Sequence, residues 1–172
     1  MDGRISAEDL AGAWSLSFSD IEFVSTKPLV ARVGIAVQLK FFAAHGFFAE
    51  AADGVPDDAI GYVVEQLGGG DLAGYDFAGR SGRRHRSEIL RYLGFRRIKP
   101  ADREALAAWI SAELCPSGMM VGAMIDRVFL WCRDGKIFAQ SRKELERLSR
   151  SERQRFLDVY LGRVVDRLHP EA

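Results

Sequence analysis

Hydrophobic residues recur along this chain at intervals of three and four, the spacing that places them on one face of an α-helix. The longest such segment starts at Pro28 and stops at Gly46. Its apolar positions are Val30, Val33, Val37, Phe41 and Ala44. This pattern predicts the most buried helix of the protein, with Arg32, Gln38 and Lys40 at the margins of the apolar stripe. Because no stretch alternates with the two-residue period of a half-buried strand, we expect an all-α protein. About eight helices should form helical-bundle or helix-turn-helix-like lobes.

Cap residues and helix breakers indicate where the helices of the first half begin and end. Ser6, which precedes two acidic residues, predicts the start of a first helix. Ser17 or Ser19 is suited to cap a second helix. Pro56 opens a later helix, which the glycines at 68–70 stop.

The second half follows the same rules. A helix after Pro100 is expected to end at Cys115-Pro116, and Ser117 to cap the next one. Residues 136–139 form a strand-like segment for which the sequence offers no partner. Ser141 and Glu144 match a capping box, which predicts a last helix reaching Leu168. Whether that helix is interrupted near Ser149 or Ser151 stays open.

The composition fits one domain or two small ones, because 172 residues with 48% hydrophobic content can form a substantial core. A basic, proline-containing joint near residues 97–100 suggests two lobes. We place the N-terminal lobe at residues 1–97 and the C-terminal lobe at 98–172, with a single continuous domain as the alternative.

Charge is distributed unevenly, although the 24 basic and 24 acidic residues cancel. Residues 1–79 carry four basic and twelve acidic residues, a net of −8. Residues 80–103 carry nine basic and two acidic residues, a net of +7. The rest carries eleven and ten, a net of +1. This distribution predicts a protein with one strongly cationic surface.

The basic segment reads as an amphipathic helix from about Arg80 to Leu93, ended by Gly94 in the left-handed conformation. At 100° per residue, the side with Ile89, Leu90 and Leu93 is apolar. The opposite side carries Arg80, Arg84 and Arg91, with Arg83 at its edge. A charged helix face is often merely solvated, but such faces usually mix signs because like charges four residues apart repel. We therefore favour contact with nucleic acid, since a helix fits the major groove of DNA.

Catalytic and metal-binding motifs are not found in the sequence. It has no His-Glu-x-x-His helix, nucleophile elbow or phosphate-binding loop. Cys115 and Cys132 lack neighbours at ligand spacing, so we expect free, partly buried thiols and no metal. His85 is more consistent with a structural or phosphate-contacting role than with acid–base chemistry. We expect no enzyme activity and no cofactor.

The chain is expected to be cytoplasmic. Its first five residues contain no hydrophobic segment of the kind found in signal peptides. Its most apolar run, residues 29–44, is broken by charged and polar residues, which argues against a membrane span.

Several segments together resemble the N-terminal region of Tn-three-family transposases, the large replicative transposases of bacteria. The most specific is Arg83-Arg84-His85-Arg86-Ser87-Glu88-Ile89, followed by Leu93-Gly94-Phe95-Arg96, which is similar to the family's Arg-x-His-x-x-Glu-Ile and Gly-Phe-Arg block. Further similar segments follow in the same order: Leu16-Ser17 with Asp20 and Val24, Gly34 to Leu39, Val55-Pro56, Tyr62-Val63, Gln66-Leu67-Gly68, Ala107-Ala108-Trp109 and Leu145-Glu146-Arg147-Leu148. One departure is that Phe138-Ala139-Gln140-Ser141 stand where the family usually has Pro-Gly.

The resemblance implies an all-helical domain of a bacterial transposase that binds the terminal inverted repeats of the transposon in double-stranded DNA. The family's Asp-Asp-Glu catalytic domain is absent from these residues, so this domain should not cut or join DNA. The expected DNA-binding residues are Arg80, Arg83, Arg84, His85, Arg86, Arg91, Arg96, Arg97 and Lys99. Two alternatives remain: a protein–protein interaction module for transposase assembly, which would contact other transposase domains or subunits, and an orphan regulator that reads another DNA site.

Overall fold

The computed structural model describes residues 5–139 and 141–168. The prediction of an all-α chain is confirmed, because the described residues form eight α-helices and just two strands of two residues each. The chain divides into two compact units, Met1–Arg96 and Arg97–Ala172, which are described separately. The boundary placed from the sequence lies one residue later, after Arg97.

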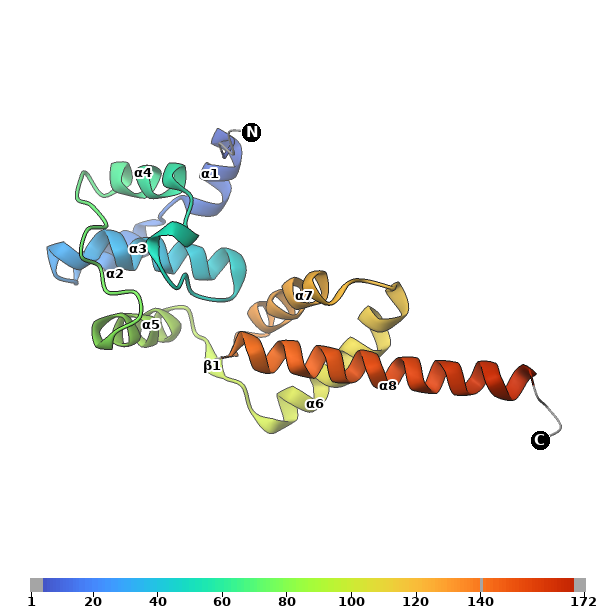
Figure 1. Cartoon of the computed structure of the whole chain (residues 1–172). Helices are drawn as coiled ribbons and strands as arrows, with labels where there is room; N and C mark the ends of the chain where they lie inside the picture. Colours follow the sequence, from blue (N-terminus) through green and yellow to red (C-terminus); the bar gives the residue numbers. More distant parts are fainter. Residues whose placement is uncertain (1–4, 140, 169–172) are drawn as a thin grey trace. The chain divides into compact units, whose positions relative to one another are not determined.

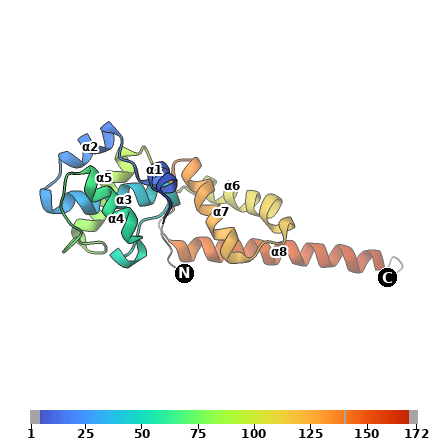
Figure 2. The same ribbon diagram turned by 90° about the horizontal axis from the view of Figure 1, so that it is seen from above.

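The first unit contains five α-helices and one 3₁₀ turn. These are α1 (Ala7–Trp14), α2 (Phe18–Ser25), α3 (Leu29–His45), the turn at Ala52–Gly54, α4 (Asp57–Gln66) and α5 (Arg80–Tyr92). Helix α3 lies between α4 and α5 (Figures 1 and 2). As predicted, α3 is the most buried helix, and Ile35, Leu39 and Phe42 form the centre of the core. It ends at Gly46, whose φ of 80° is the left-handed conformation that glycine adopts without strain.

Two predictions about side chains of α3 are wrong. Gln38 was expected at the margin, but it is 1% exposed. Its amide satisfies the backbone of Ala49 from both sides: Nε2 donates to the carbonyl at 2.9 Å, and the Ala49 amide donates to Oε1 at 3.0 Å. A buried polar group that is fully paired in this way is tolerated in a core. Val30 was expected on the buried stripe but is exposed, whereas Ala31 in the same first turn is buried, so the covered side of α3 at this end does not include Val30.

The predicted caps of the first unit are present. The Ser6 hydroxyl accepts a hydrogen bond from the Asp9 amide at 3.0 Å. Ser17, rather than Ser19, caps α2, and it forms a reciprocal capping box with Asp20.

The second unit contains three helices around a smaller core. These are α6 (Pro100–Trp109), continued by a π-helical segment (Ile110–Leu114) and a 3₁₀ turn (Cys115–Ser117), α7 (Val121–Asp134) and α8 (Arg142–Leu168). The side chains of Leu106, Ile110, Met124, Ile125 and Phe129 form its core. None of the described helices combines the length and the hydropathy needed to cross a membrane.

The strand-like segment does have a partner, contrary to expectation. Strand β2 (Ile137–Phe138) pairs with β1 (Arg96–Arg97), and the Ile98 amide donates to the Phe138 carbonyl at 3.1 Å. Two arginines carry no strand pattern, so this partner could not be recognised from the sequence. The departure from the family at residues 138–141 includes Gln140, which lies outside the described residues.

Two further expectations for the second unit are corrected or resolved. Ser117 does not cap α7; its hydroxyl instead donates to the Leu114 carbonyl at 2.6 Å and closes the preceding turn. Helix α8 runs without interruption through Ser149 and Ser151. Leu145, Ser149 and Glu152 are buried at helical spacing. Packing of this side of α8 against the rest of the second unit therefore stabilises the helix at serines, which have a low helix propensity.

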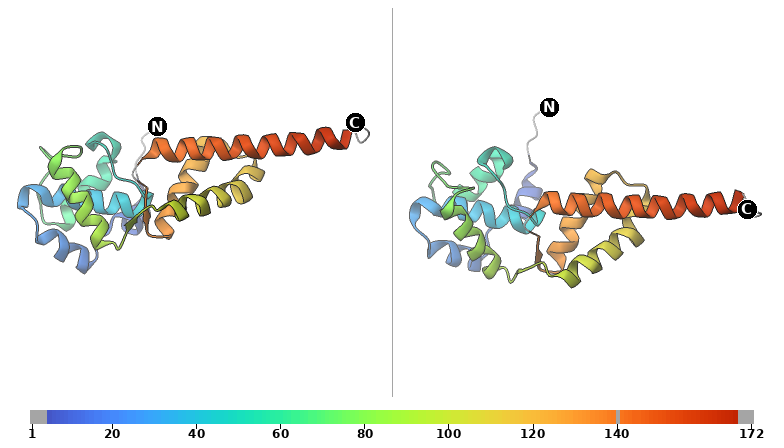
Figure 3. Two further views of the ribbon diagram at one scale, coloured as in Figure 1. Left: turned by 90° about the horizontal axis from the view of Figure 1, so that it is seen from below. Right: turned by 60° about the horizontal axis from the view of Figure 1, so that its bottom comes forward.

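The second half of α8 extends beyond α6 and α7 (Figure 3). Its apolar side chains are exposed there, including Leu157, Val159, Tyr160, Leu161 and Val165.

Candidate nucleic-acid interface

Helix α5 is anchored to the first unit along one side. Ile89 is fully buried, and Gly82 packs so closely that a Cβ there would lie 2.1 Å from the Asp76 carbonyl oxygen. The buried residues Gly82, His85 and Ile89 recur at intervals of three and four. This spacing leaves the other side of α5 facing solvent, as the sequence predicted.

The N-terminal end of α5 is capped from outside the helix. Gly79 stands at the N-cap position and has no side chain, so the Asp76 carboxylate takes its place. It accepts hydrogen bonds from the amides of Gly79 at 2.5 Å and Ser81 at 3.2 Å. These amide bonds, the Gly79 bond above all, lower the pKa of Asp76.

The C-terminal end of α5 is fixed to α2. The Tyr92 ring stacks on Phe23 with centroids 4.4 Å apart, and its hydroxyl donates to Asp20 Oδ1 at 2.8 Å. Burial and this hydrogen bond raise the pKa of Tyr92 to about 12, so it stays a donor. Gly94 then ends the helix with a φ of 74°, and the Phe95 amide donates to the Leu90 carbonyl at 2.8 Å.

The solvent side of α5 is a row of arginines and serines. Its exposed residues are Arg80, Ser81, Arg83, Arg84, Ser87 and Arg91, here called the arginine face. The side chain of Arg84 is 65% exposed. Nη1 of Arg83 donates to the Ala78 carbonyl at 3.2 Å, and Ser87 Oγ donates to the Arg83 carbonyl at 3.1 Å. Both residues are exposed to solvent.

The single acid of α5 is neutralised by a residue from another part of the unit. Glu88 Oε2 lies 2.7 Å from Nζ of Lys27, which stands in the turn between α2 and α3. Its other oxygen lies 3.8 Å from Nε of Arg84. The Lys27 hydrogen bond holds the pKa of Glu88 below its usual value. Because Lys27 takes most of this negative charge, the arginine face keeps its cationic character. No pattern in the sequence indicates this pairing.

Two of the expected DNA-binding residues point into the unit instead. The guanidinium of Arg86 donates to the carbonyls of Phe77 at 2.6 Å and Ala49 at 3.4 Å. His85 is 5% exposed, and its ring stacks on Tyr75 at 5.7 Å. Burial first, and then the charge of Arg84, lower the pKa of His85. Both residues therefore contact the first unit on the side of α5 that faces away from the arginine face.

The remaining expected residues lie after the helix. Arg96 is exposed at the end of the first unit, whereas Arg97 and Lys99 are exposed in the second. The Lys99 amide donates to Asp102 Oδ2 at 2.8 Å, at the start of α6. The residues that the structure brings together are therefore Arg80, Arg83, Arg84 and Arg91.

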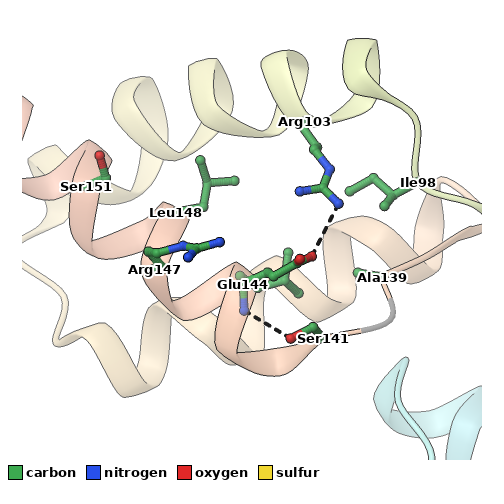
Figure 4. A pocket seen from close by; sticks show the side chains of 9 residues that line it. Ile98, Arg103, Ala139, Ser141, Glu144, Arg147, Leu148 and Ser151 are labelled. Carbon is green, nitrogen blue, oxygen red and sulfur yellow. Dashed lines mark hydrogen bonds and ion pairs between the residues drawn. The ribbon is translucent and has the colours of Figure 1, made fainter.

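A pocket of about 310 Å³ in the second unit offers a second polar site. It is lined by Ile98, Arg103, Ala139, Ser141, Glu144, Leu145, Arg147, Leu148 and Ser151. Figure 4 shows Arg103 and Arg147 reaching toward the same space. Nη2 of Arg103 lies 3.2 Å from Glu144 Oε2, so half of the cationic charge of this pair is already compensated. The pocket is therefore a weaker anion site than the arginine face.

The cysteines and the other potential metal-ligating side chains form no cluster in the part of the chain that the structure describes. The described residues contain no group of three or more His, Cys, Asp or Glu side chains able to hold a metal ion. Cys115 and Cys132 are free and buried, and burial raises the pKa of the Cys132 thiol to about 11.

Comparison with known proteins identifies the family to which this architecture belongs. No curated protein matches the chain. One family profile, described as "Domain of unknown function (DUF4158)", matches residues 2–151, a range that contains all of α5 and ends within α8. The chain therefore belongs to the DUF4158 family.

Proposed function

We propose that this chain is the DNA-binding domain of a Tn-three-type transposase and recognises the terminal inverted repeats of the transposon. It binds double-stranded DNA through the arginine face of α5 and has no catalytic activity of its own. The resemblance of residues 83–96 to the N-terminal region of these transposases supports the assignment to transposition. The match to DUF4158 adds no function.

The observation that carries the proposal is the open arginine face with its one acid neutralised by Lys27. Arg80, Arg83, Arg84, Arg86 and Arg91 against Glu88 give α5 a charge of +4, and four of these five arginines are exposed. Arginine forms bidentate hydrogen bonds with phosphate and with the N7 and O6 atoms of guanine. We assign Arg83, Arg84 and Arg91 to phosphates or guanines, and Arg80 to a phosphate that sets the register.

Fluorescence anisotropy with a labelled duplex of the transposon end tests this assignment. Four to six neutralised phosphates give a slope of about −4 to −5 in a plot of log affinity against log salt concentration. Arg84→Ala should reduce the affinity and make the slope shallower by about one. Binding that responds neither to salt nor to Arg84→Ala would reject the proposal.

Two further variants test whether the effect of Arg84→Ala is specific to the geometry and position of this arginine. Arg84→Lys keeps the charge but loses the bidentate geometry, so it should preserve the salt slope while weakening discrimination between duplexes. Arg127→Ala removes an exposed arginine from α7 and should leave the affinity closer to wild type than Arg84→Ala does. Selection of bound duplexes from a random pool distinguishes a transposase domain from an orphan regulator, because the regulator would select a site other than a transposon end.

A second function, as an interaction module for transposase assembly, is favoured by one observation. The second half of α8 exposes Leu157, Val159, Tyr160, Leu161 and Val165 on a single helix. Exposed apolar side chains in such a group are typical of protein interfaces. Sedimentation that shows self-association, together with no retardation of any duplex, would favour this function over DNA binding.

A further inference from the structure

Two aliphatic side chains are exposed at the start of α3. Leu29 and Val30 are the first residues of α3 and are 79% and 84% exposed. They follow directly on Thr26, Lys27 and Pro28, the turn that joins α2 to α3. We call Leu29 and Val30 the aliphatic tip.

The turn that carries the aliphatic tip is tightly held. Arg32 Nε donates to the Lys27 carbonyl at 2.9 Å and Nη2 to the Ser25 carbonyl at 2.7 Å. Thr26 Oγ1 donates to the Phe23 carbonyl at 2.7 Å, and Nζ of Lys27 lies 4.5 Å from the centre of the Phe23 ring. The exposure of Leu29 and Val30 is therefore fixed by the surrounding structure and does not reflect a loose loop.

The same turn is joined to the arginine face. Lys27, two residues before Leu29, forms the 2.7 Å ion pair with Glu88, and Glu88 also faces Arg84. The turn that carries the aliphatic tip is therefore held next to Arg84 through the carboxylate of Glu88. A ligand for the combined surface must supply negative charge and small apolar groups side by side.

We propose that Leu29 and Val30 contact the C5 methyl groups of thymines in the groove that α5 enters; this inference rests on the proposed function. The thymine methyl is the apolar feature that the major groove presents among hydrogen-bonding base edges, and aliphatic side chains read it by contact. The arginine face then supplies affinity for phosphates and guanines, and the aliphatic tip selects thymine at adjoining positions. A protein partner of purely apolar character fits this surface poorly, because it would have to cover the arginines as well.

Thymine-to-uracil replacement tests the proposal, since it removes the methyl group and nothing else. The probe is the tightest duplex selected from a random pool by the full chain, with each thymine replaced singly by uracil. For the wild-type protein, one or two replacements should lower the affinity about threefold to fivefold, the loss expected for one buried methyl group. Leu29→Ala with Val30→Ala should weaken binding of the unmodified duplex about tenfold, without changing the salt slope, and should abolish the response to uracil.

The control Leu161→Ala truncates another exposed leucine, on α8, and should retain the full response to uracil. Thermal unfolding of each variant verifies that truncation at these exposed positions leaves the fold intact. If the double variant binds the unmodified duplex as tightly as wild type, or keeps the response to uracil, the proposal is wrong although the arginine face still binds DNA. If the wild-type chain binds no duplex, the proposed function itself has failed. If the double variant binds DNA normally but loses self-association, the tip is a protein contact and the thymine assignment is overturned.

Discussion

Nζ of Lys27 lies 2.7 Å from Oε2 of Glu88, across 61 positions of sequence. This ion pair joins the α2–α3 turn to the middle of α5 and compensates the one acid of that helix. Without Lys27, Glu88 would face Arg84 alone and repel an approaching phosphate.

Lys27→Met should therefore weaken DNA binding about fivefold, which corresponds to about 1 kcal/mol, the order of one exposed charge interaction. Glu88→Gln in the same chain should restore the affinity, because no uncompensated carboxylate then remains. Anisotropy titrations of the two single variants and the double variant measure this coupling. Independent, additive effects of the two changes would show that Lys27 itself contacts the DNA instead.

Gly34→Ala should destabilise the first unit by roughly 1–3 kcal/mol, because overpacking a tight contact forces neighbouring atoms to move. A Cβ at Gly34 would lie 2.0 Å from Cδ2 of Tyr75, whose ring packs on α3 and stacks on His85. Gly61→Ala on α4 is the control, since a Cβ there meets no atom within 4 Å. Urea unfolding should show Gly61→Ala equal to or more stable than wild type. Equal stabilities for both variants would contradict this packing.

Gln38→Leu should destabilise the first unit by about 2–3 kcal/mol, because it leaves the buried Ala49 amide without an acceptor. In the variant the Ala49 carbonyl still accepts a hydrogen bond from Nη2 of Arg86, which lies at 3.4 Å. The destabilisation therefore comes mainly from the unpaired Ala49 amide. Gln154→Leu on α8 removes an exposed bond to Asp158 and should change stability little. Calorimetric melting temperatures of the two variants provide the comparison, and similar shifts would refute the buried role of Gln38.

The stability of the first unit should fall as the pH drops below about 6.5, the ordinary pKa of histidine. Burial lowers the pKa of His85 in the folded chain, so the unfolded chain binds a proton at pH values where the folded chain does not. The contribution of neutral His85 to the free energy of unfolding is therefore complete above pH 6.5 and is lost as the pH falls through the lowered pKa of the folded chain. His85→Gln should flatten the stability curve between pH 8 and pH 5 in urea titrations. His45→Gln, at an exposed position, is the comparison variant, and an equal flattening in both variants would contradict the role of the buried His85.

Features that depend on neighbouring residues in the chain could be predicted from the sequence. The left-handed glycines Gly46 and Gly94 end α3 and α5 where the polar and apolar pattern stops. The division of α5 into buried and exposed sides also follows from the spacing of its residues. Ile89 lies inside and Arg84 outside, because a helix repeats every 3.6 residues.

Features that depend on residues far apart could not be predicted. Arg86 belongs to the same basic segment as Arg84, yet it turns inward to carbonyls that only the folded chain places beneath α5. Val30 follows the apolar spacing of α3, but the covered side of the first turn is the one that carries Ala31. The partner of Glu88 likewise belongs to a turn whose position relative to α5 is set by the packing of α2 and α3.

The cap that Asp76 forms on α5 determines which part of the helix can meet DNA. The N-terminal end of a helix, with its partial positive charge, commonly binds a backbone phosphate. At the start of α5 the Asp76 carboxylate already accepts the hydrogen bonds of the Gly79 and Ser81 amides. DNA must therefore lie along the flank of α5 and not across its end. From Arg80 to Arg91 this flank measures about 16 Å, which corresponds to about five base pairs.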